Sequence, residues 1–237
     1  LTINRFDELL SIFDRRLPIF ERILKEAKNK KAKNKAFVIG INGIDGAGKT
    51  RFAESLEKFL ISRGCETQAI YLDDFHNPRS FRYAGDNQAE NYYNRSFNIN
   101  LIVAKLLAPL RQKRRFSTKL TVLDWRTDKY DIEREYSFNQ NTIVIFEGVF
   151  LFRRELAPYI DYKIFLETPF EESLKRSGTR DSGDTISKYE SKYLPAQAKY
   201  LEEYPPDKVA DMVIDNTDWE YPVIKSEEKN RDTTKPL

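Results

Sequence analysis

The sequence predicts an α/β fold in which a mostly parallel central sheet of about five strands is flanked by helices. Three observations predict it. Short, continuous apolar runs at 37–41, 142–146 and 162–166 are typical of strands buried on both faces. Segments with apolar residues at helical spacing lie between these runs. A glycine-rich octet at 43–50 separates the first predicted strand from the helical segment after it.

The octet at 43–50 reads GIDGAGKT and matches G-x-x-x-x-G-K-T, the phosphate-binding P-loop. Its glycines let the backbone curl so that N–H groups point inward at phosphate oxygens. Lys49 supplies a positive charge at the β- and γ-phosphates, and the Thr50 hydroxyl is placed to ligate Mg²⁺. We therefore predict a P-loop NTPase fold that binds ATP and Mg²⁺, with the choice between ATP and GTP left open. The predicted nucleotide contacts are Gly43, Asp45, Gly46, Ala47, Gly48, Lys49, Thr50 and Arg51.

Composition excludes several classes of protein. The chain has 237 residues, of which 40% are hydrophobic, enough for one α/β domain. Its net charge of +3 does not indicate a nucleic-acid binder. Cys65 is the sole cysteine, which excludes a disulfide framework and fits a reducing cytoplasm. No apolar run approaches the roughly 18 residues of a membrane span, so we expect a cytoplasmic protein without a membrane span or secretory signal.

Residues 1–35 are expected to precede the main domain as a separate unit. Apolar residues at helical spacing predict one or two amphipathic helices over 1–28, broken near Pro18. We expect these helices to pack on the outside of the domain, with an interface for a partner helix as the alternative. A basic linker at 28–35 (KNKKAKNK) then leads into the P-loop domain, predicted over 36–217.

The remaining elements follow the alternation expected of this fold. Before residue 124 they are a helix at 51–62, a strand at 67–72, an irregular polar and aromatic segment at 79–98 that would cover a substrate, a helix at 99–110, and a short strand at 120–123 ending near the pocket. After the strands at 142–146 and 162–166 come a lid helix at 169–176, a loop at 177–183, a long helix at 185–203 and a strand at 211–214. The polar residues 218–237 are expected to be a disordered tail.

Acidic residues stand at the carboxyl ends of two predicted parallel strands. Asp73 and Asp74 follow one strand, and Glu147 follows another. Right-handed crossovers bring such strand ends together beside a P-loop, at the edge where ligands bind. Magnesium that bridges phosphates takes one or two oxygen ligands from protein. We expect Thr50, Glu147 and Asp73 around the metal, and Asp73 as the general base for an acceptor hydroxyl. The alternative for each acid is a turn residue at a strand end.

The ordered segments GIDGAGKT, YLDDFH, VIFEGVFLF, LETPFEESLKRSGTRD and ADMVIDNTD resemble the uridine kinase family of P-loop kinases, over roughly 36–217. That family is similar to phosphoribulokinases, nicotinamide riboside kinases and pantothenate kinases. The resemblance implies ATP-dependent phosphorylation of a hydroxyl group on a small, nucleoside-like metabolite. It implies that Asp73 is the catalytic base, that Glu147 is the family's glutamate after the buried strand, and that Arg176 and Arg180 are lid arginines.

The chain departs from this family where the acceptor would bind. The family usually holds a ribose with an Asp-rich segment, whereas 91–98 reads NYYNRSFN and contains no carboxylate. The lid, KRSGTRD, carries fewer arginines than usual, and His76 replaces a tyrosine beside the substrate. Arg95 would favour an acceptor that already carries negative charge. The candidate acceptor contacts are Asp74, His76, Tyr92, Tyr93, Arg95, Trp125 and Arg126.

Three functions stay open at this point. The first is a kinase for a nucleoside-like acceptor, and the second is a kinase for a non-nucleoside or anionic alcohol such as a sugar, glycerate or a pantothenate-like molecule. The third is a non-catalytic, nucleotide-binding regulatory module. Asp73 favours the two kinases, because a binding module has no need of an acceptor base. The expected partner is the small-molecule acceptor, without nucleic acid or membrane, and a homo-oligomer stays open.

Overall fold

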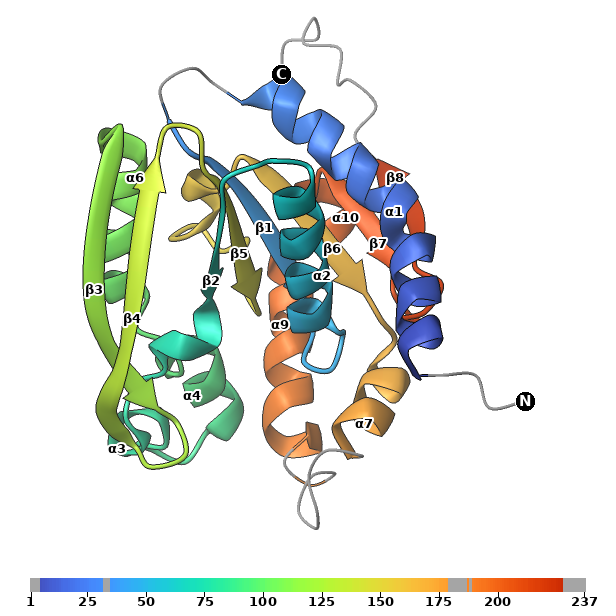
Figure 1. The fold of residues 1–237 in the computed structure, drawn as a ribbon. Helices are drawn as coiled ribbons and strands as arrows, with labels where there is room; N and C mark the ends of the chain where they lie inside the picture. Colours follow the sequence, from blue (N-terminus) through green and yellow to red (C-terminus); the bar gives the residue numbers. More distant parts are fainter. Residues whose placement is uncertain (1–4, 32–34, 179–186, 188, 228–237) are drawn as a thin grey trace, which may run out of the picture.

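A computed structural model gives the fold for residues 5–31, 35–178, 187 and 189–227. Its centre is a six-stranded sheet in the order β2-β5-β1-β6-β7-β8 (Figure 1). Five strands are parallel: β1 (Phe37–Gly43), β2 (Thr67–Tyr71), β5 (Ile143–Gly148), β6 (Tyr162–Glu167) and β7 (Met212–Asp215). The α/β fold with a mostly parallel sheet is confirmed, with one strand more than expected. None of the helices in the described ranges is long and apolar enough to cross a bilayer.

The sixth strand, β8 (Val223–Glu227), pairs antiparallel with β7. The expectation of a disordered tail over 218–237 is therefore wrong for 223–227, and 228–237 lie outside the described residues. The strand was missed because an edge strand needs backbone partners rather than apolar side chains. Its residues are exposed or half-buried, so they carry no apolar run.

Two apolar cores lie on the two faces of the sheet, because successive strand residues point to opposite sides. On β1, Phe37, Ile39 and Ile41 belong to one core, while Val38 belongs to the other. The first core is covered by helices α1 (Arg5–Lys30) and α2 (Lys49–Ser62). The second is covered by the segments between β2 and β5 and by helix α9 (Leu194–Glu203).

Helix α1 runs unbroken through Pro18, so the predicted break is absent. Pro18 is exposed, while Ile19 and Phe20 directly after it are buried, and the Phe20 ring meets that of Phe52 on α2 edge-on at 5.3 Å. This packing offsets the hydrogen bond that a proline removes from a helix interior.

Polar side chains on α1 reach the C-terminal part of the described chain. Arg16 is 4% exposed, and its Nη2 donates to the Trp219 carbonyl at 2.7 Å. Arg22 pairs with Glu227 on β8, with Nη2 and Oε2 3.2 Å apart. Helix α1 is therefore fastened to the loop after β7 and to the edge strand.

Between β2 and β5 the chain forms more regular structure than predicted. The 3-10 turn η1 (Leu72–Phe75) follows β2, and α3 (Arg79–Arg82) and α4 (Gln88–Arg95) replace the irregular segment expected at 79–98. The Asn87 side chain caps α4 by accepting from the Glu90 amide at 3.0 Å. The expected helix at 99–110 is present as α5 (Ile99–Ile102), the π-helical turn η2 (Val103–Leu107) and α6 (Ala108–Gln112).

A two-stranded hairpin of β3 (Arg115–Asp124) and β4 (Lys129–Asn139) stands beside the main sheet (Figure 1). The predicted strand at 120–123 was therefore too short, and its partner was missed. Charged residues on the solvent face hide the strand pattern, while Val122, Tyr136 and Phe138 face the core.

The remaining elements lie after β5. They are the 3-10 turn η3 (Ala157–Tyr159), helix α7 (Phe170–Gly178), the π-helical turn η4 (Tyr189–Tyr193) that leads into α9, and helix α10 (Pro206–Val209). Most of the predicted loop at 177–183, and the first residues of the predicted helix at 185–203, fall outside the described residues.

Candidate functional site

The P-loop connects β1 to the amino end of α2. Its glycines are required for two different reasons. Gly46 and Gly48 have φ angles of 74° and 87°, in the left-handed region that glycine adopts without strain. At Gly43 the reason is close packing, since a Cβ there would lie 2.7 Å from the Leu166 carbonyl oxygen on β6. The loop thus wraps tightly around the start of a 14-residue helix, whose free N–H groups favour anions.

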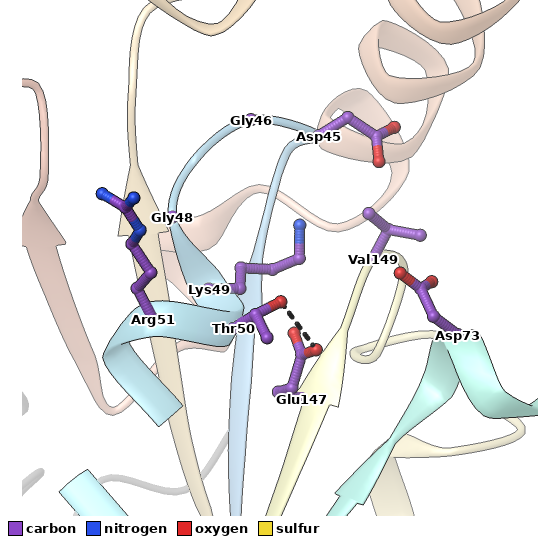
Figure 2. Close-up of a pocket in the computed structure, with 9 residues that line it drawn as sticks. All are labelled: Asp45, Gly46, Gly48, Lys49, Thr50, Arg51, Asp73, Glu147 and Val149. Carbon is purple, nitrogen blue, oxygen red and sulfur yellow. Dashed lines mark hydrogen bonds between the residues drawn. The ribbon is translucent and has the colours of Figure 1, made fainter. Parts of the chain in front are cut away.

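A pocket opens in front of this loop (Figure 2). Lys49, Thr50 and Glu147 point into it from one side, and Asp73 faces them from the other. Thr50 Oγ1 donates to Glu147 Oε1 at 3.1 Å, and Lys49 Nζ donates to the Ile44 carbonyl at 2.9 Å. The lining residues are Asp45, Gly46, Gly48, Lys49, Thr50, Arg51, Asp73, Glu147 and Val149.

Glu147 is a buried acid of the pocket with a raised pKa. It is 3% exposed, and burial raises its pKa to about 7, with the Lys49 charge opposing the rise and Asp73 adding to it. Its Oε2 atom is buried and has no hydrogen-bond partner in the described part of the chain. A buried carboxylate oxygen without a donor is a position that a cation would satisfy.

The residues present fit Mg²⁺ as it occurs with nucleotides. The described residues contain no group of three His, Cys, Asp or Glu side chains that could hold a metal on its own. Magnesium in nucleotide sites needs only one or two protein ligands, because phosphates and water complete its shell. The Thr50 hydroxyl and the unpartnered oxygen of Glu147 would be two such ligands on one side of the pocket.

Asp73 reaches the pocket because η1 approaches the end of β5 closely. A Cβ at Gly148, directly after Glu147, would lie 2.4 Å from the Leu72 Cβ, so only glycine allows this approach. Asp74 takes no part in the pocket. Its two oxygens accept from Arg134 Nε and Nη2, each at 3.0 Å, which fastens the hairpin strand β4 to η1.

Asp45 fastens the P-loop to three surrounding helices. Its Oδ2 accepts from the Tyr92 hydroxyl at 2.7 Å and from Gln197 Nε2 at 3.0 Å, and its amide donates to Gln197 Oε1 at 2.8 Å. Its carbonyl accepts from the Ser173 hydroxyl on α7. Burial raises the pKa of the Asp45 carboxyl, while the charge of Lys49 and the bond from Tyr92 oppose that rise. The Asp45 side chain is therefore hydrogen-bonded to helices α4 and α9.

The structure describes only one of the two predicted lid arginines. Arg176 on α7 donates to the carbonyls of Asn216 and Thr217 at 3.0 and 2.6 Å, and to that of Gly46 at 3.4 Å, so it lies beside the P-loop. Arg180 falls outside the described residues. Arg51 points away from Lys49, and its guanidinium lies 5.0 Å from the Trp219 ring (Figure 2).

Of the predicted acceptor contacts, His76 is joined most directly to the pocket. Its Nδ1 lies 2.7 Å from the Asp73 carbonyl, and its ring packs on Phe97 at 4.8 Å. Tyr92 is held by the P-loop residue Asp45, whereas the Tyr93 hydroxyl turns to Glu203 at 2.5 Å.

Arg95 donates to the Ala84 carbonyl at 2.8 Å. Trp125 and Arg126 occupy the turn of the β3–β4 hairpin, where Arg79 holds their carbonyls at 3.0 and 2.9 Å. Neither of them lines the pocket at the P-loop.

Sequence reasoning missed Gln197, Ser173 and Gly148. A glycine directly after a strand-end acid is a signal of close backbone approach, and it could have indicated Gly148. Gln197 and Ser173 lie in ordinary helical segments far from the P-loop in sequence, and no local pattern distinguishes them.

Comparison with known proteins agrees with this geometry. The model of the Phosphoribulokinase / Uridine kinase family matches residues 38–217. The uridine kinase of Chlamydia pneumoniae is 27% identical, covering 75% of this chain and 80% of its own. Nicotinamide riboside kinase 1 of Homo sapiens is 26% identical, covering 71% of this chain and 78% of its own. The structure of a possible uridine kinase from Bacillus stearothermophilus has a TM-score of 0.69 and 26% identity, covering 84% of this chain and 97% of that one.

Proposed function

This chain belongs to the phosphoribulokinase / uridine kinase family, and from that premise we propose that it transfers the γ-phosphoryl group of Mg²⁺·ATP to a hydroxyl group of a small, nucleoside-like metabolite. Membership of the family makes it a phosphotransferase that uses ATP and takes an alcohol group as acceptor. One observation carries the rest of the proposal. Asp73 shares a single pocket with Lys49, Thr50 and Glu147.

Each side chain has a role that its position supports. The P-loop N–H groups and Lys49 bind the phosphates and stabilise charge that develops on the transferred group. Thr50 and Glu147 would hold Mg²⁺, which neutralises phosphate charge when it is bound. Asp73 is exposed at the pocket wall, and its carboxylate accepts the proton of the acceptor hydroxyl as that oxygen attacks phosphorus.

The nucleoside-like acceptor rests on the relatives. Two of them are named uridine kinase and nicotinamide riboside kinase, and both names denote a kinase of a nucleoside. The regulatory-module alternative is less well supported, because Asp73 faces the phosphate-binding loop from outside it.

The proposal is tested by ADP formation with and without acceptors, in wild type and in Lys49→Ala. We expect acceptor-dependent ADP release that Lys49→Ala abolishes, because the variant removes a charge that stabilises the transferring phosphoryl group. Lys58→Ala, at an exposed lysine on the same helix, is the matched control and should keep wild-type turnover. ATP binding without any acceptor-stimulated turnover would favour the regulatory module, and full activity in Lys49→Ala would refute the P-loop assignment.

A further inference from the structure

Two buried cations lie against the rings of Tyr83 and Tyr92, outside the lining of the P-loop pocket. Lys192, in the turn η4, is 7% exposed, and Arg82, in helix α3, is 9% exposed. Resting on the proposed function, we propose that the acceptor carries an oxyanion, a carboxylate or a phosphate, and that Lys192 and Arg82 bind it while Asp73 receives the proton of its hydroxyl.

Lys192 has aromatic neighbours where a buried ammonium would ordinarily have a carboxylate. Its Nζ lies 4.8, 5.2 and 4.8 Å from the ring centroids of Tyr83, Tyr92 and Tyr193. Its side chain is hydrogen-bonded to Tyr83, and the Asp45 carboxylate attracts its charge. Tyrosine rings offset only part of the cost of burying this charge, and burial lowers the pKa of Lys192. An anionic ligand would add a counter-charge in direct contact with this ammonium.

Arg82 is also incompletely paired. Its Nη2 lies 3.7 Å from Asp128 Oδ1, which is too long for a good hydrogen bond, and its Nε is buried without a partner in the described residues. The Asp128 carboxylate is already taken up by the Arg79 amide, at 2.9 and 3.1 Å. A guanidinium has five donors arranged to grip an oxyanion, and here one of the buried donors is unused.

Aromatic side chains connect the cations to the neighbourhood of the proposed base. Lys192 lies 5.2 Å from the Tyr92 ring, the Tyr92 ring lies 6.4 Å from that of Phe97, and Phe97 packs on His76 at 4.8 Å. Burial lowers the pKa of His76, the charges of Arg82 and Lys192 lower it further, and the Asp73 carboxylate opposes them. The charges of Arg82, Lys192 and Asp73 therefore all act on one histidine, whose Nδ1 is 2.7 Å from the Asp73 carbonyl.

The surrounding elements leave this cluster accessible and connected to the P-loop. Tyr92, whose ring contacts Lys192, donates its hydroxyl to Asp45. Tyr83 is 50% exposed, so one wall of the cluster faces solvent. Helices α3 and α4 and the beginning of α9 all lie at the end of the molecule to which the parallel strands point (Figure 1).

In this proposal, Lys192 and Arg82 replace Arg95 as the residues expected to bind the anion. The Arg95 guanidinium donates to a backbone carbonyl and lies 5.8 Å from the Phe81 ring. Arg82 keeps a buried Nε without a partner in the described residues, and Lys192 lies buried against the same Tyr83 ring.

The test compares acceptors that differ by one anionic group. Suitable pairs are uridine and orotidine, nicotinamide riboside and nicotinic acid riboside, glycerol and D-glycerate, and ribulose and ribulose 5-phosphate. We expect kcat/KM to be at least about 10-fold higher for the anionic member of a productive pair. The carboxylate and phosphate pairs then show which oxyanion is used. Preference for the neutral member throughout would overturn the inference.

Variants assign the effect to the two cations. Lys192→Gln and Arg82→Gln should each raise KM for the anionic acceptor about 10- to 100-fold and leave the neutral one within about twofold. Lys192→Arg should retain much of the preference. The control is Lys199→Gln, because Lys199 also contacts a tyrosine ring, Tyr93 at 5.1 Å, but already has a carboxylate partner in Glu90. Equal losses on both members of a pair would assign the cations to structure alone.

A binding measurement separates this inference from the proposed function. Calorimetry on protein saturated with Mg²⁺ and a non-hydrolysable ATP analogue measures the binding of inorganic phosphate and of D-glycerate outside the P-loop. Binding that Lys192→Gln abolishes, without turnover of any acceptor, supports the anion subsite and counts against the kinase proposal. Absence of binding, together with efficient turnover of a neutral nucleoside, overturns the subsite and leaves the kinase proposal standing.

Discussion

Asparagine substitutions at two adjacent aspartates should affect different properties, the catalytic rate at Asp73 and the stability at Asp74. Asp73 lines the phosphate pocket, so Asp73→Asn removes the proposed proton acceptor and should lower kcat by about 10²- to 10⁴-fold. Asp74 forms a fork with Arg134, whose side chain is 42% exposed, so Asp74→Asn loses a solvent-screened pair worth up to about 1 kcal/mol. For a domain of this size the corresponding fall in Tm is about 2–4 °C, with kcat nearly unchanged.

The assay couples ADP release to a spectrophotometric readout at saturating acceptor, and ATP affinity is measured separately with a fluorescent analogue. Both variants should bind ATP as wild type does, because neither carboxylate belongs to the P-loop. Circular dichroism at the assay temperature controls for folding. Equal losses of kcat, or a larger loss in Asp74→Asn, would mean that the proton acceptor is not Asp73.

Three further perturbations follow from the site. Gly148→Ala places a methyl group 2.4 Å from the Leu72 Cβ and displaces η1, so kcat should fall about 10²-fold and the free energy of unfolding by about 1–3 kcal/mol. Tyr92→Phe removes a 2.7 Å hydrogen bond to the Asp45 carboxylate and should lower Tm by an amount equivalent to about 1–3 kcal/mol. Burial raises the pKa of Glu147 from 4.5 to about 7. Between pH 4.5 and 7, the folded state therefore keeps a proton on Glu147 that the unfolded state has lost. As pH rises through this window, wild type should therefore lose up to about 3 kcal/mol of stability that Glu147→Gln keeps.

Each of these has a measurement that can contradict it. Steady-state kinetics and thermal melts of Gly148→Ala would refute the close-approach argument if both match wild type. An unchanged melting temperature in Tyr92→Phe would mean that the bond to the P-loop contributes nothing. Chemical denaturation of wild type and Glu147→Gln from pH 4.5 to 7 should diverge, and parallel curves would exclude a buried, proton-binding glutamate.

Much of the fold was predictable because its signals are local. The P-loop octet and the apolar runs at 142–146 and 162–166 each specify an element without reference to distant residues. The hairpin carried a weaker signal that could have been used, since Ile132, Tyr136 and Phe138 are spaced for one face of a strand. Helix α4 also had a start signal, an asparagine at 87 followed three residues later by Glu90.

The site was predictable only in part, because its remaining features arise from tertiary packing. Asp45 and Gln197 are 152 residues apart, and no periodicity connects them. The difference between Asp73 and Asp74 depends on where Arg134 lies, which requires the hairpin. Likewise, Lys192 and Arg82 look like ordinary surface cations in sequence, and only their burial in the fold distinguishes them.

The fastening of helix α1 has a consequence during synthesis on the ribosome. The bond from Arg16 to the Trp219 carbonyl spans 203 residues, so at roughly 5–20 residues per second it cannot form until about 10–40 s after Arg16 is made. The apolar face of α1 can meet α2 earlier, but its polar side must stay hydrated until the last described strand emerges. This outer brace is therefore a late event in folding, and weakening it should mainly accelerate unfolding while leaving the folding rate nearly unchanged.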